Sequence, residues 1–404
     1  MIIPSIDLSE GKAVQLVGGE RKVLEREDVT GLAESFARFG EVAVIDIDAA
    51  RGTGSNSTVV EKLCKIADCR VGGGIRDEET ARRFLRAGAK KLILGTAATP
   101  ALLSRLPKDS LIVALDVRGG EVLSHGWRSS TGVRAEQKIK ETEEYCSGYL
   151  LTAVEKEGRL EGTDWELIEN VRKMTSLPLT VAGGFATLSD IKRAHELGCD
   201  VQLGMALYTN KIDLVESFVS LIKFDPLVPT VVSDREGNLL MLAYSSQDSL
   251  KEALKTGCGV YFSRSRNSIW KKGETSSNTQ KLLRVFHDCD SDALLFIVEQ
   301  KGDACHKGKY SCFGERKFTL NSLHRIFKER VESQKEGSYT LKLLSDKQTL
   351  GEKIREEAEE LVKAETAEEV RYEAADVLYF TAVKLFSAGV SFDEVLNELR
   401  GRQR

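Results

Sequence analysis

The chain has 404 residues and a formal net charge of −4, with 41% hydrophobic and 30% charged residues. This length predicts two to four domains, and the composition is that of an ordinary globular protein. The slightly acidic balance comes without a basic tail or stripe, which argues against nucleic acid or an anionic membrane as a partner. The longest apolar runs are strand-sized, so we predict no transmembrane helix.

The first residues and the cysteines indicate a cytoplasmic location. The start reaches a charge at Asp7 and has no basic region, unlike a signal peptide. Eight cysteines are too few for a disulfide scaffold in a chain of this length, so we expect reduced thiols.

Residues 1–222 alternate short β-branched runs with amphipathic stretches. Eight such strand–helix units predict a (β/α)8 TIM barrel, and near-continuous apolar strands suit its buried parallel sheet. The predicted strands are Ile2–Asp7, Val42–Asp48, Arg70–Gly73, Lys91–Gly95, Leu111–Val117, Tyr149–Val154, Leu179–Ala182 and Val201–Gly204.

The predicted barrel repeats itself, because the run Val71–Ile75 recurs as Val181–Phe185. Each half also has a carboxylate near a strand end, Asp7 and Asp116, where barrel enzymes place their chemistry. Glycine loops at such ends let backbone N–H groups bind phosphate, so two sets predict a ligand with a phosphate at each end. The predicted phosphate-binding residues are Gly73, Gly74, Gly95, Thr96, Gly183, Gly184 and Gly204.

Four runs, Met1–Leu8, Val71–Arg76, Ala114–Gly120 and Gly126–Trp127, resemble the phosphoribosylformimino-aminoimidazole-carboxamide ribotide (ProFAR) isomerase family. The resemblance implies conversion of an aminoaldose to an aminoketose. It makes Asp7 the base at C2, Asp116 the acid at the ring oxygen, and Thr152 a polar helper in the substrate site. Two carboxylates in different environments suit this acid–base work.

Three places depart from that family. Gln15 stands where the family usually has arginine, Glu157–Arg159 replaces a D-G-T loop, and Met205 replaces the arginine of G-R-A. Losing basic groups near a phosphate weakens the hold on substrate. The alternative is therefore a non-catalytic barrel that acts as a scaffold for a bifunctional pyrophosphohydrolase and cyclohydrolase.

Residues 223–320 predict a small α+β domain, joined to the barrel by a stiff linker at Pro226 and Pro229. A helix is expected at Gln247–Thr256. The predicted strands are Thr230–Ser233, Leu239–Tyr244, Val260–Ser263, Lys281–His287 and Leu294–Glu299.

This domain contains the largest concentration of candidate metal ligands in the chain. Carboxylates alternate with a thiol at Asp288–Asp292, and two more thiols follow at Cys305 and Cys312. Thiolates suit zinc and carboxylates suit magnesium; three thiols leave the open position of a catalytic zinc site. The alternative is three unrelated cysteines beside a solvated acidic turn.

The D-C-D-x-D run, the C-H pair, the final C-F-G and Ser263–Ser276 resemble phosphoribosyl-AMP cyclohydrolase. The resemblance implies opening of the adenine ring between N1 and C6, with zinc on Cys289, Cys305 and Cys312. It implies magnesium on Asp288, Asp290 and Asp292. Because the ligands of this family come from two subunits, it also implies a homodimer. His306 is a candidate proton shuttle, unless it is simply an exposed histidine. The candidates for phosphate and ribose contacts, unless they are only a charged surface loop, are Arg264, Arg266, Lys272 and Glu274.

Residues 321–404 predict an all-α domain, with a helical connector at Asn321–Gly337 and helices at Leu350–Ala364, Ala367–Ala388 and Phe392–Leu399. Carboxylates three residues apart share a helix face, and two facing pairs suit magnesium and a polyphosphate. The predicted ligands are Glu356, Glu357, Glu360, Glu373 and Asp376.

The runs K-I-R-E-E-A-E-E-L and E-A-A-D-V-L-Y resemble phosphoribosyl-ATP pyrophosphohydrolase, which implies a MazG-like helical fold with Glu357 and Glu360 in catalysis. The three resemblances name consecutive steps of histidine biosynthesis that act on phosphoribosyl nucleotides. Two alternatives remain open: barrel and helical domain as partner-binding scaffolds, and general nucleotide clean-up by the helical domain.

Overall fold

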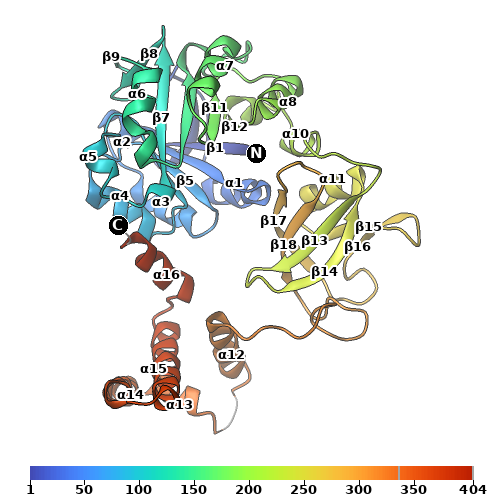
Figure 1. Cartoon of the computed structure of the whole chain (residues 1–404). Helices are drawn as coiled ribbons and strands as arrows, with labels where there is room; N and C mark the ends of the chain where they lie inside the picture. The colour runs from blue at the N-terminus through green and yellow to red at the C-terminus, as the bar shows by residue number, and fades with distance from the viewer. Residues whose placement is uncertain (335–336, 403–404) are drawn as a thin grey trace. The chain divides into compact units, whose positions relative to one another are not determined.

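The computed structural model describes residues 1–334 and 337–402, which form two compact units (Figure 1). One unit contains Met1–Glu315 and the other Arg316–Leu399. Each is described by itself. The finer domain limits at 222/223 and 320/321 stay predictions.

A closed barrel of parallel strands begins the first unit and confirms the predicted (β/α)8 fold. Its last strand pairs with its first, through Ile2 opposite Val201, so the barrel has no open edge. In order around the barrel the strands are β1 (Ile2–Ser9), β4 (Val42–Asp46), β5 (Cys69–Gly72), β6 (Lys91–Leu94), β7 (Leu111–Arg118), β10 (Gly148–Ala153), β11 (Leu179–Ala182) and β12 (Cys199–Leu203).

Helices follow the strands, and most begin at an aspartate or threonine whose side chain accepts a backbone N–H, as at Asp77 and Thr187. They are α1 (Val29–Phe36), α2 (Ile47–Arg51), α3 (Ser57–Cys64), α4 (Glu78–Arg86), α5 (Pro100–Leu103), α6 (Ala135–Thr142), α7 (Trp165–Met174), α8 (Leu188–Glu196), α9 (Met205–Tyr208) and α10 (Leu214–Val219).

Two hairpins were not predicted. They extend β1 and β7, which hold equivalent places in the two half-barrels. Their strands are β2 (Lys12–Val17), β3 (Arg21–Arg26), β8 (Glu121–Ser124) and β9 (Ser129–Arg134).

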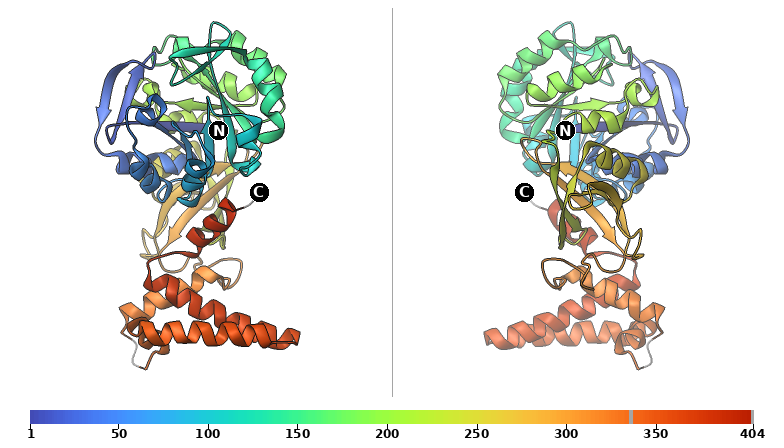
Figure 2. Two further views of the ribbon diagram at one scale, coloured as in Figure 1. Left: turned by 90° about the vertical axis from the view of Figure 1, so that its left-hand side faces the viewer. Right: turned by 90° about the vertical axis from the view of Figure 1, so that its right-hand side faces the viewer.

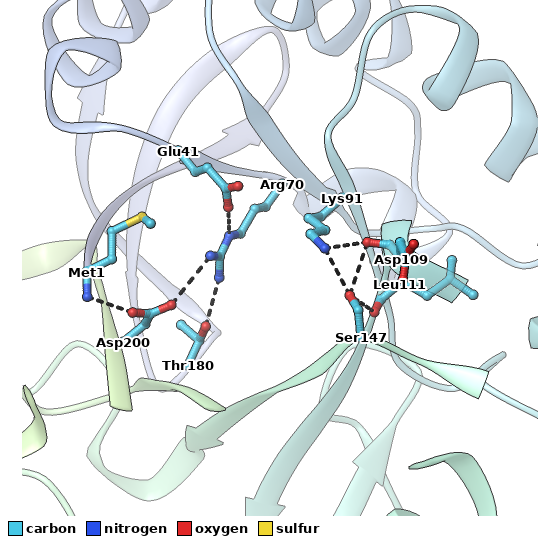
Figure 3. A network of polar contacts seen from close by, with 9 residues as sticks. All are labelled: Met1, Glu41, Arg70, Lys91, Asp109, Leu111, Ser147, Thr180 and Asp200. Atoms are coloured by element: carbon cyan, nitrogen blue, oxygen red, sulfur yellow. Dashed lines mark hydrogen bonds and ion pairs between the residues drawn. The ribbon is translucent and has the colours of Figure 1, made fainter. Parts of the chain in front are cut away.

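The barrel is tied together at the N-terminal ends of its strands by Arg70 (Figure 3). Arg70 lies on β5 and donates to Thr180 Oγ1 (2.8 Å) on β11, the strand opposite β5 in the ring. The same guanidinium pairs with Glu41 and, at 3.5 Å, with Asp200, which also binds the Met1 amino group at 2.6 Å. A buried cation thus links the two half-barrels.

We predict that Arg70→Met destabilises the chain, because it leaves Glu41 without its buried partner. The carboxylates keep some contact with water, so we expect a loss of about 2 kcal/mol, below the value for a fully buried pair. Urea unfolding would measure it. Lys140→Met, which breaks an exposed pair with Glu136, should change the free energy of unfolding by less than about 0.5 kcal/mol. Equal effects for the two variants would contradict the role of Arg70.

A four-stranded sheet follows the barrel, in the order β14-β13-β18-β17, beside a two-stranded hairpin. The predicted helix Gln247–Thr256 is α11, with the predicted limits. The linker prediction was wrong at Pro229, which lies within β13 opposite Tyr244. The strands are β13 (Val228–Asp234), β14 (Leu239–Ser245), β15 (Val260–Ser263), β16 (Ser268–Lys271), β17 (Gln280–His287) and β18 (Leu294–Gln300).

The second unit is helical, as predicted, and its helices α14 and α15 pack against each other (Figure 2). Part of the predicted connector, residues 335–336, lies outside the described residues. No single helix that the structure describes is long and apolar enough to cross a membrane; only Ala367–Ser387 taken with Phe392–Leu399, a pair bent by 105°, meets that length and composition. The helices are α12 (Leu320–Glu332), α13 (Tyr339–Ser345), α14 (Lys347–Lys363), α15 (Ala367–Ser387) and α16 (Phe392–Gly401).

Candidate active sites

The mouth of the barrel gathers the residues that the repeat predicted. One cavity at the C-terminal strand ends is lined by Asp7 from β1, Asp116 from β7 and Thr152 from β10. The glycine loops of both halves line the same cavity. They contribute Gly73, Gly74, Gly95, Thr96, Gly183, Gly184 and Gly204.

Different physical constraints explain why glycine occupies these loop positions. At Gly73 and Gly183, with φ of +92° and +97°, a Cβ would lie 2.2 Å from Asp46 O and 2.7 Å from Ala153 O. Close backbone packing alone therefore requires glycine there. A Cβ at Gly95 would meet its nearest atom only at 4.0 Å. Packing does not require that glycine, which leaves room in the cavity for a ligand.

Three carboxyl groups share this cavity, and one was not among the predicted site residues. Ser5 Oγ donates to Asp7 Oδ1 at 2.7 Å, yet burial raises the pKa of Asp7 to about 6. Burial also raises the pKa of Asp116, against hydrogen bonds from Trp127 and Thr152 that lower it. Burial, together with the charges of Asp7 and Asp116, raises the pKa of Glu157 to about 8.

These shifts separate the protonation states of Asp7 and Glu157. At neutral pH, Asp7 is mostly ionised and Glu157 keeps its proton. Acids with separated pKa values are what acid–base catalysis needs. From the sequence, Glu157 was noted only as a departure from the family pattern. Its position shortly after the barrel strand β10 was the feature that could have placed it at the mouth.

The other departures make the cavity uneven in charge. Arg51, Arg76 and His125 line it on the side of the first half-barrel. On the other side, Gln15 is buried with its side chain directed at Gly204, and its Nε2 has no hydrogen-bond partner among the described residues. Met205 lines that side too. Amide and thioether groups thus stand where the resembling family has cations.

We predict that Glu157→Gln stabilises the fold in a pH-dependent way. The folded chain keeps a proton that the unfolded chain releases above its ordinary pKa of 4.5, so wild-type stability falls as the pH rises from 4.5 to about 8. Glutamine does not titrate. The melting temperature of the variant should therefore match that of the wild type below this window and exceed it by several degrees above it. If calorimetry showed the same difference in melting temperature at every pH, Glu157 would not have the raised pKa described above.

In the second candidate site, the oxygens of Asp288, Asp290 and Asp292 lie within 4.8 Å of one another. They do so on a turn, because β17 ends at His287. The charge of Asp290, with burial and the charge of Asp288, raises the pKa of Asp292. A divalent cation on these hard oxygen ligands would relieve that repulsion, so the residues fit magnesium.

The three cysteines are only partly brought together. Cys305 and Cys312 are close enough for the Cys305 thiol, together with burial, to raise the pKa of Cys312. Cys289 is exposed, 4.0 Å from Asp290 Oδ1, and the three thiols are not among the ligand groups that converge within 4.8 Å in the described chain. Two adjacent thiols fit a soft cation such as zinc, with room for a third ligand.

Of the predicted contact residues of this domain, Lys272 lies close enough to Cys305 and Cys312 to feel their charge. Lys272 donates to Ala304 O at 2.6 Å, next to Cys305, and burial lowers its pKa. The Arg264 guanidinium lies 3.8 Å from the centre of the Tyr244 ring. The remaining three are exposed: Arg266, Glu274 and His306.

In the helical unit, α14 and α15 bring Glu357, Glu360 and Glu373 within 4.8 Å of one another. Burial and the charge of Asp376 raise the pKa of Glu357, so Asp376 is a neighbour of this group. Glu356 is not among these converging carboxylates; it pairs with Lys353 at 2.7 Å, and the same lysine lies 3.6 Å from Glu357. The structure therefore places Glu356 outside the acidic group.

Comparison with known proteins shows which protein families this chain resembles. A barrel with three carboxyl groups in its mouth, followed by two regions with clustered carboxylates, matches three family models in chain order. The chain belongs to the family described as histidine biosynthesis protein, whose model matches residues 1–213. Models of phosphoribosyl-AMP cyclohydrolase and phosphoribosyl-ATP pyrophosphohydrolase match residues 241–314 and 320–403.

Curated relatives follow the same division. The chain is 40% identical over 230 residues to a 1-(5-phosphoribosyl)-5-((5-phosphoribosylamino)methylideneamino)imidazole-4-carboxamide isomerase of Methanopyrus kandleri, covering 53% of this chain and 95% of that protein. It is 42% identical over 196 residues to the histidine biosynthesis bifunctional protein HisIE of Pyrococcus furiosus, covering 45% and 94%. The histidine biosynthesis trifunctional protein of Saccharomyces bayanus is 49% identical over 176 residues, 43% of this chain but only 22% of that protein's length.

Proposed function

We propose that the chain carries out three consecutive steps of histidine biosynthesis. The helical domain would hydrolyse phosphoribosyl-ATP to phosphoribosyl-AMP and pyrophosphate. The middle domain would open the adenine ring, and the barrel would isomerise the resulting ProFAR to its aminoketose. The observation that supports this most is the order of the three family matches, each of which contains its own cluster of acidic groups.

In the barrel, Asp7 would act as the base. Ionised at neutral pH, it would take the proton from C2 of the opened aminoaldose. The resemblance makes Asp116 the acid at the ring oxygen. Glu157 is the second candidate, because its pKa of about 8 keeps a proton available. The proton lost from C2 and the proton gained by the ring oxygen balance to give the enaminol. Transfer of its C2 hydroxyl proton to C1 then gives the aminoketose, and no step changes the overall oxidation state.

In the middle domain, Cys305 and Cys312 would hold zinc, and Cys289 of a second subunit would complete the site in a homodimer. Asp288, Asp290 and Asp292 would hold magnesium against the substrate phosphate. Zinc, when bound, activates water for hydrolysis near neutral pH. Lys272 adds positive charge beside the thiols, and its charge works to lower the pKa of Cys312.

In the helical domain, Glu357, Glu360 and Glu373 would hold magnesium, with Asp376 beside them. Magnesium, when bound, neutralises charge on the polyphosphate. A fully ionised acidic group at this place would repel the substrate. The same acids also suit general nucleotide hydrolysis, and competition with common nucleoside triphosphates would separate the two uses.

A time course with the purified chain, phosphoribosyl-ATP, magnesium and trace zinc tests the proposal. Chromatography is needed, because the substrate and product of the isomerase have equal mass. Accumulation of the aminoketose supports all three activities. A stop at the ring-opened aldose would support the alternative of a non-catalytic barrel, and no turnover at all would refute the pathway assignment.

For the barrel, we predict that Asp7→Asn lowers the isomerisation rate about 100-fold or more, because the amide cannot accept the C2 proton. Pyrophosphate release and ring opening in the same chain are the internal controls and should be unchanged. Isomerisation at the wild-type rate would show that Asp7 is not the base.

For the helical domain, Glu360→Gln and Glu356→Gln form a matched pair on one helix. Glu360→Gln removes one of the converging carboxylate oxygens. We therefore expect a higher magnesium concentration to be needed for activity and a rate at least about tenfold lower, as is typical when a metal site loses a supporting group. Glu356→Gln removes the pair with Lys353 at 2.7 Å, leaves that lysine its pair with Glu357 at 3.6 Å, and should keep most activity. Rates of pyrophosphate release against magnesium concentration would decide, and equal losses would contradict the assignment of ligands.

A further inference from the structure

The barrel and the four-stranded sheet share one hydrophobic core. Phe39, which follows α1, and Phe218 on α10 belong to the same buried cluster as Phe296 on β18. The rings of Phe39 and Phe218 meet edge to face, with centres 5.9 Å apart. The sheet domain thus packs directly against the barrel through apolar side chains, in addition to its covalent connection.

Polar contacts surround this core and fix two elements of the sheet domain. Arg284 on β17 forms an ion pair with Asp68, which precedes β5 of the barrel. Lys251 on α11 lies 2.7 Å from Glu216 on α10. Together with the shared core, these contacts hold β17 in one position against the barrel.

The acidic turn begins where β17 ends, and it touches the barrel side directly. The ring of His287 meets the rings of His195 on α8 (6.0 Å between centres) and Phe218 on α10 (5.9 Å). The Lys223 backbone N–H donates to Ser291 O at 2.8 Å. Ser291 is fully buried, with a φ of +64°.

The two residues that contact the barrel, His287 and Ser291, are direct sequence neighbours of the three aspartates. His287 Nδ1 lies 2.8 Å from Asp288 O and 3.1 Å from Ser291 Oγ, so the ring ties the first residue of the acidic turn to its middle. Three carboxylates at cation distance repel one another, and an unsupported turn would relax apart. A turn held in place beforehand binds a cation more tightly, because less order is lost on binding.

We propose that His195 and Phe218 of the barrel, with the Lys223 backbone, are positioning residues for the cation site at Asp288, Asp290 and Asp292. They act through His287 and Ser291 and touch neither cation nor substrate. The inference rests on the proposed magnesium role of these aspartates. In this chain the barrel then supports the chemistry of the next domain in addition to its own.

Manganese binding followed by electron paramagnetic resonance tests the proposal without relying on turnover. The full chain would be loaded with zinc and would carry Glu357→Gln and Glu373→Gln to silence the helical group. We expect His195→Ala to weaken manganese binding roughly two- to tenfold, the range for loss of one aromatic contact. His195→Phe, which restores a ring, should recover the affinity.

Two controls separate positioning from general damage. Lys192→Ala changes an exposed residue of the same helix and should leave manganese affinity unchanged. His195 does not line the barrel mouth, so isomerisation should also be unaffected. In a chain that already carries His287→Ala, the His195→Ala substitution should have no further effect, because its action passes through that ring.

The outcomes distinguish this inference from the proposed function. If Asp290→Asn abolishes manganese binding but His195→Ala does not weaken it, the positioning role is wrong and the magnesium site stands. If Asp290→Asn leaves binding unchanged, the magnesium assignment fails and the inference falls with it. Equal weakening by His195→Ala and His195→Phe would also overturn it.

Discussion

Mutual repulsion among carboxylates is the constraint that shapes all three candidate sites. Each site brings three acids close together, and in each the pKa of at least one acid is raised. Such a group is stable only if a proton or a cation offsets its charge. The surroundings decide which. In the barrel mouth burial dominates, and a proton on Glu157 serves. On the exposed turn and between the helices, where hard oxygen ligands are open to solvent, a divalent cation suits better.

The barrel treats its two ends in opposite ways. At the N-terminal ends of the strands, the Arg70 guanidinium pairs with Glu41 and Asp200 and bonds to Thr180 across the ring. At the C-terminal ends, the acids face one another without a cation between them. The ion pairs stabilise one end of the barrel, whereas the raised pKa values of the acids at the other end work against folding at neutral pH.

Apolar patterning was sufficient to predict the buried barrel strands, but not the exposed hairpins or the contacts between side chains. Buried strands such as Leu179–Ala182 were predicted within a residue or two, because a barrel interior requires continuous apolar runs. Strand β3, at Arg21–Arg26, is mostly exposed and charged, so nothing in its pattern marked it. The sequence could not tell Glu356 from Glu357 either: neighbours on a helix point in different directions, and only packing against α15 shows which one faces the group.

The uneven charge of the barrel mouth bears on whether the barrel is catalytic. The loss of cations at Gln15 and Met205 affects the hold on one phosphate, whereas Arg51 and Arg76 remain on the other side. The acids at the centre are a separate matter. A barrel that served only as a support would gain stability at neutral pH from a neutral residue at Glu157, since its raised pKa works against folding there. Three buried acids with raised pKa values around an open cavity therefore favour a working site with weaker grip at one end over an inert support.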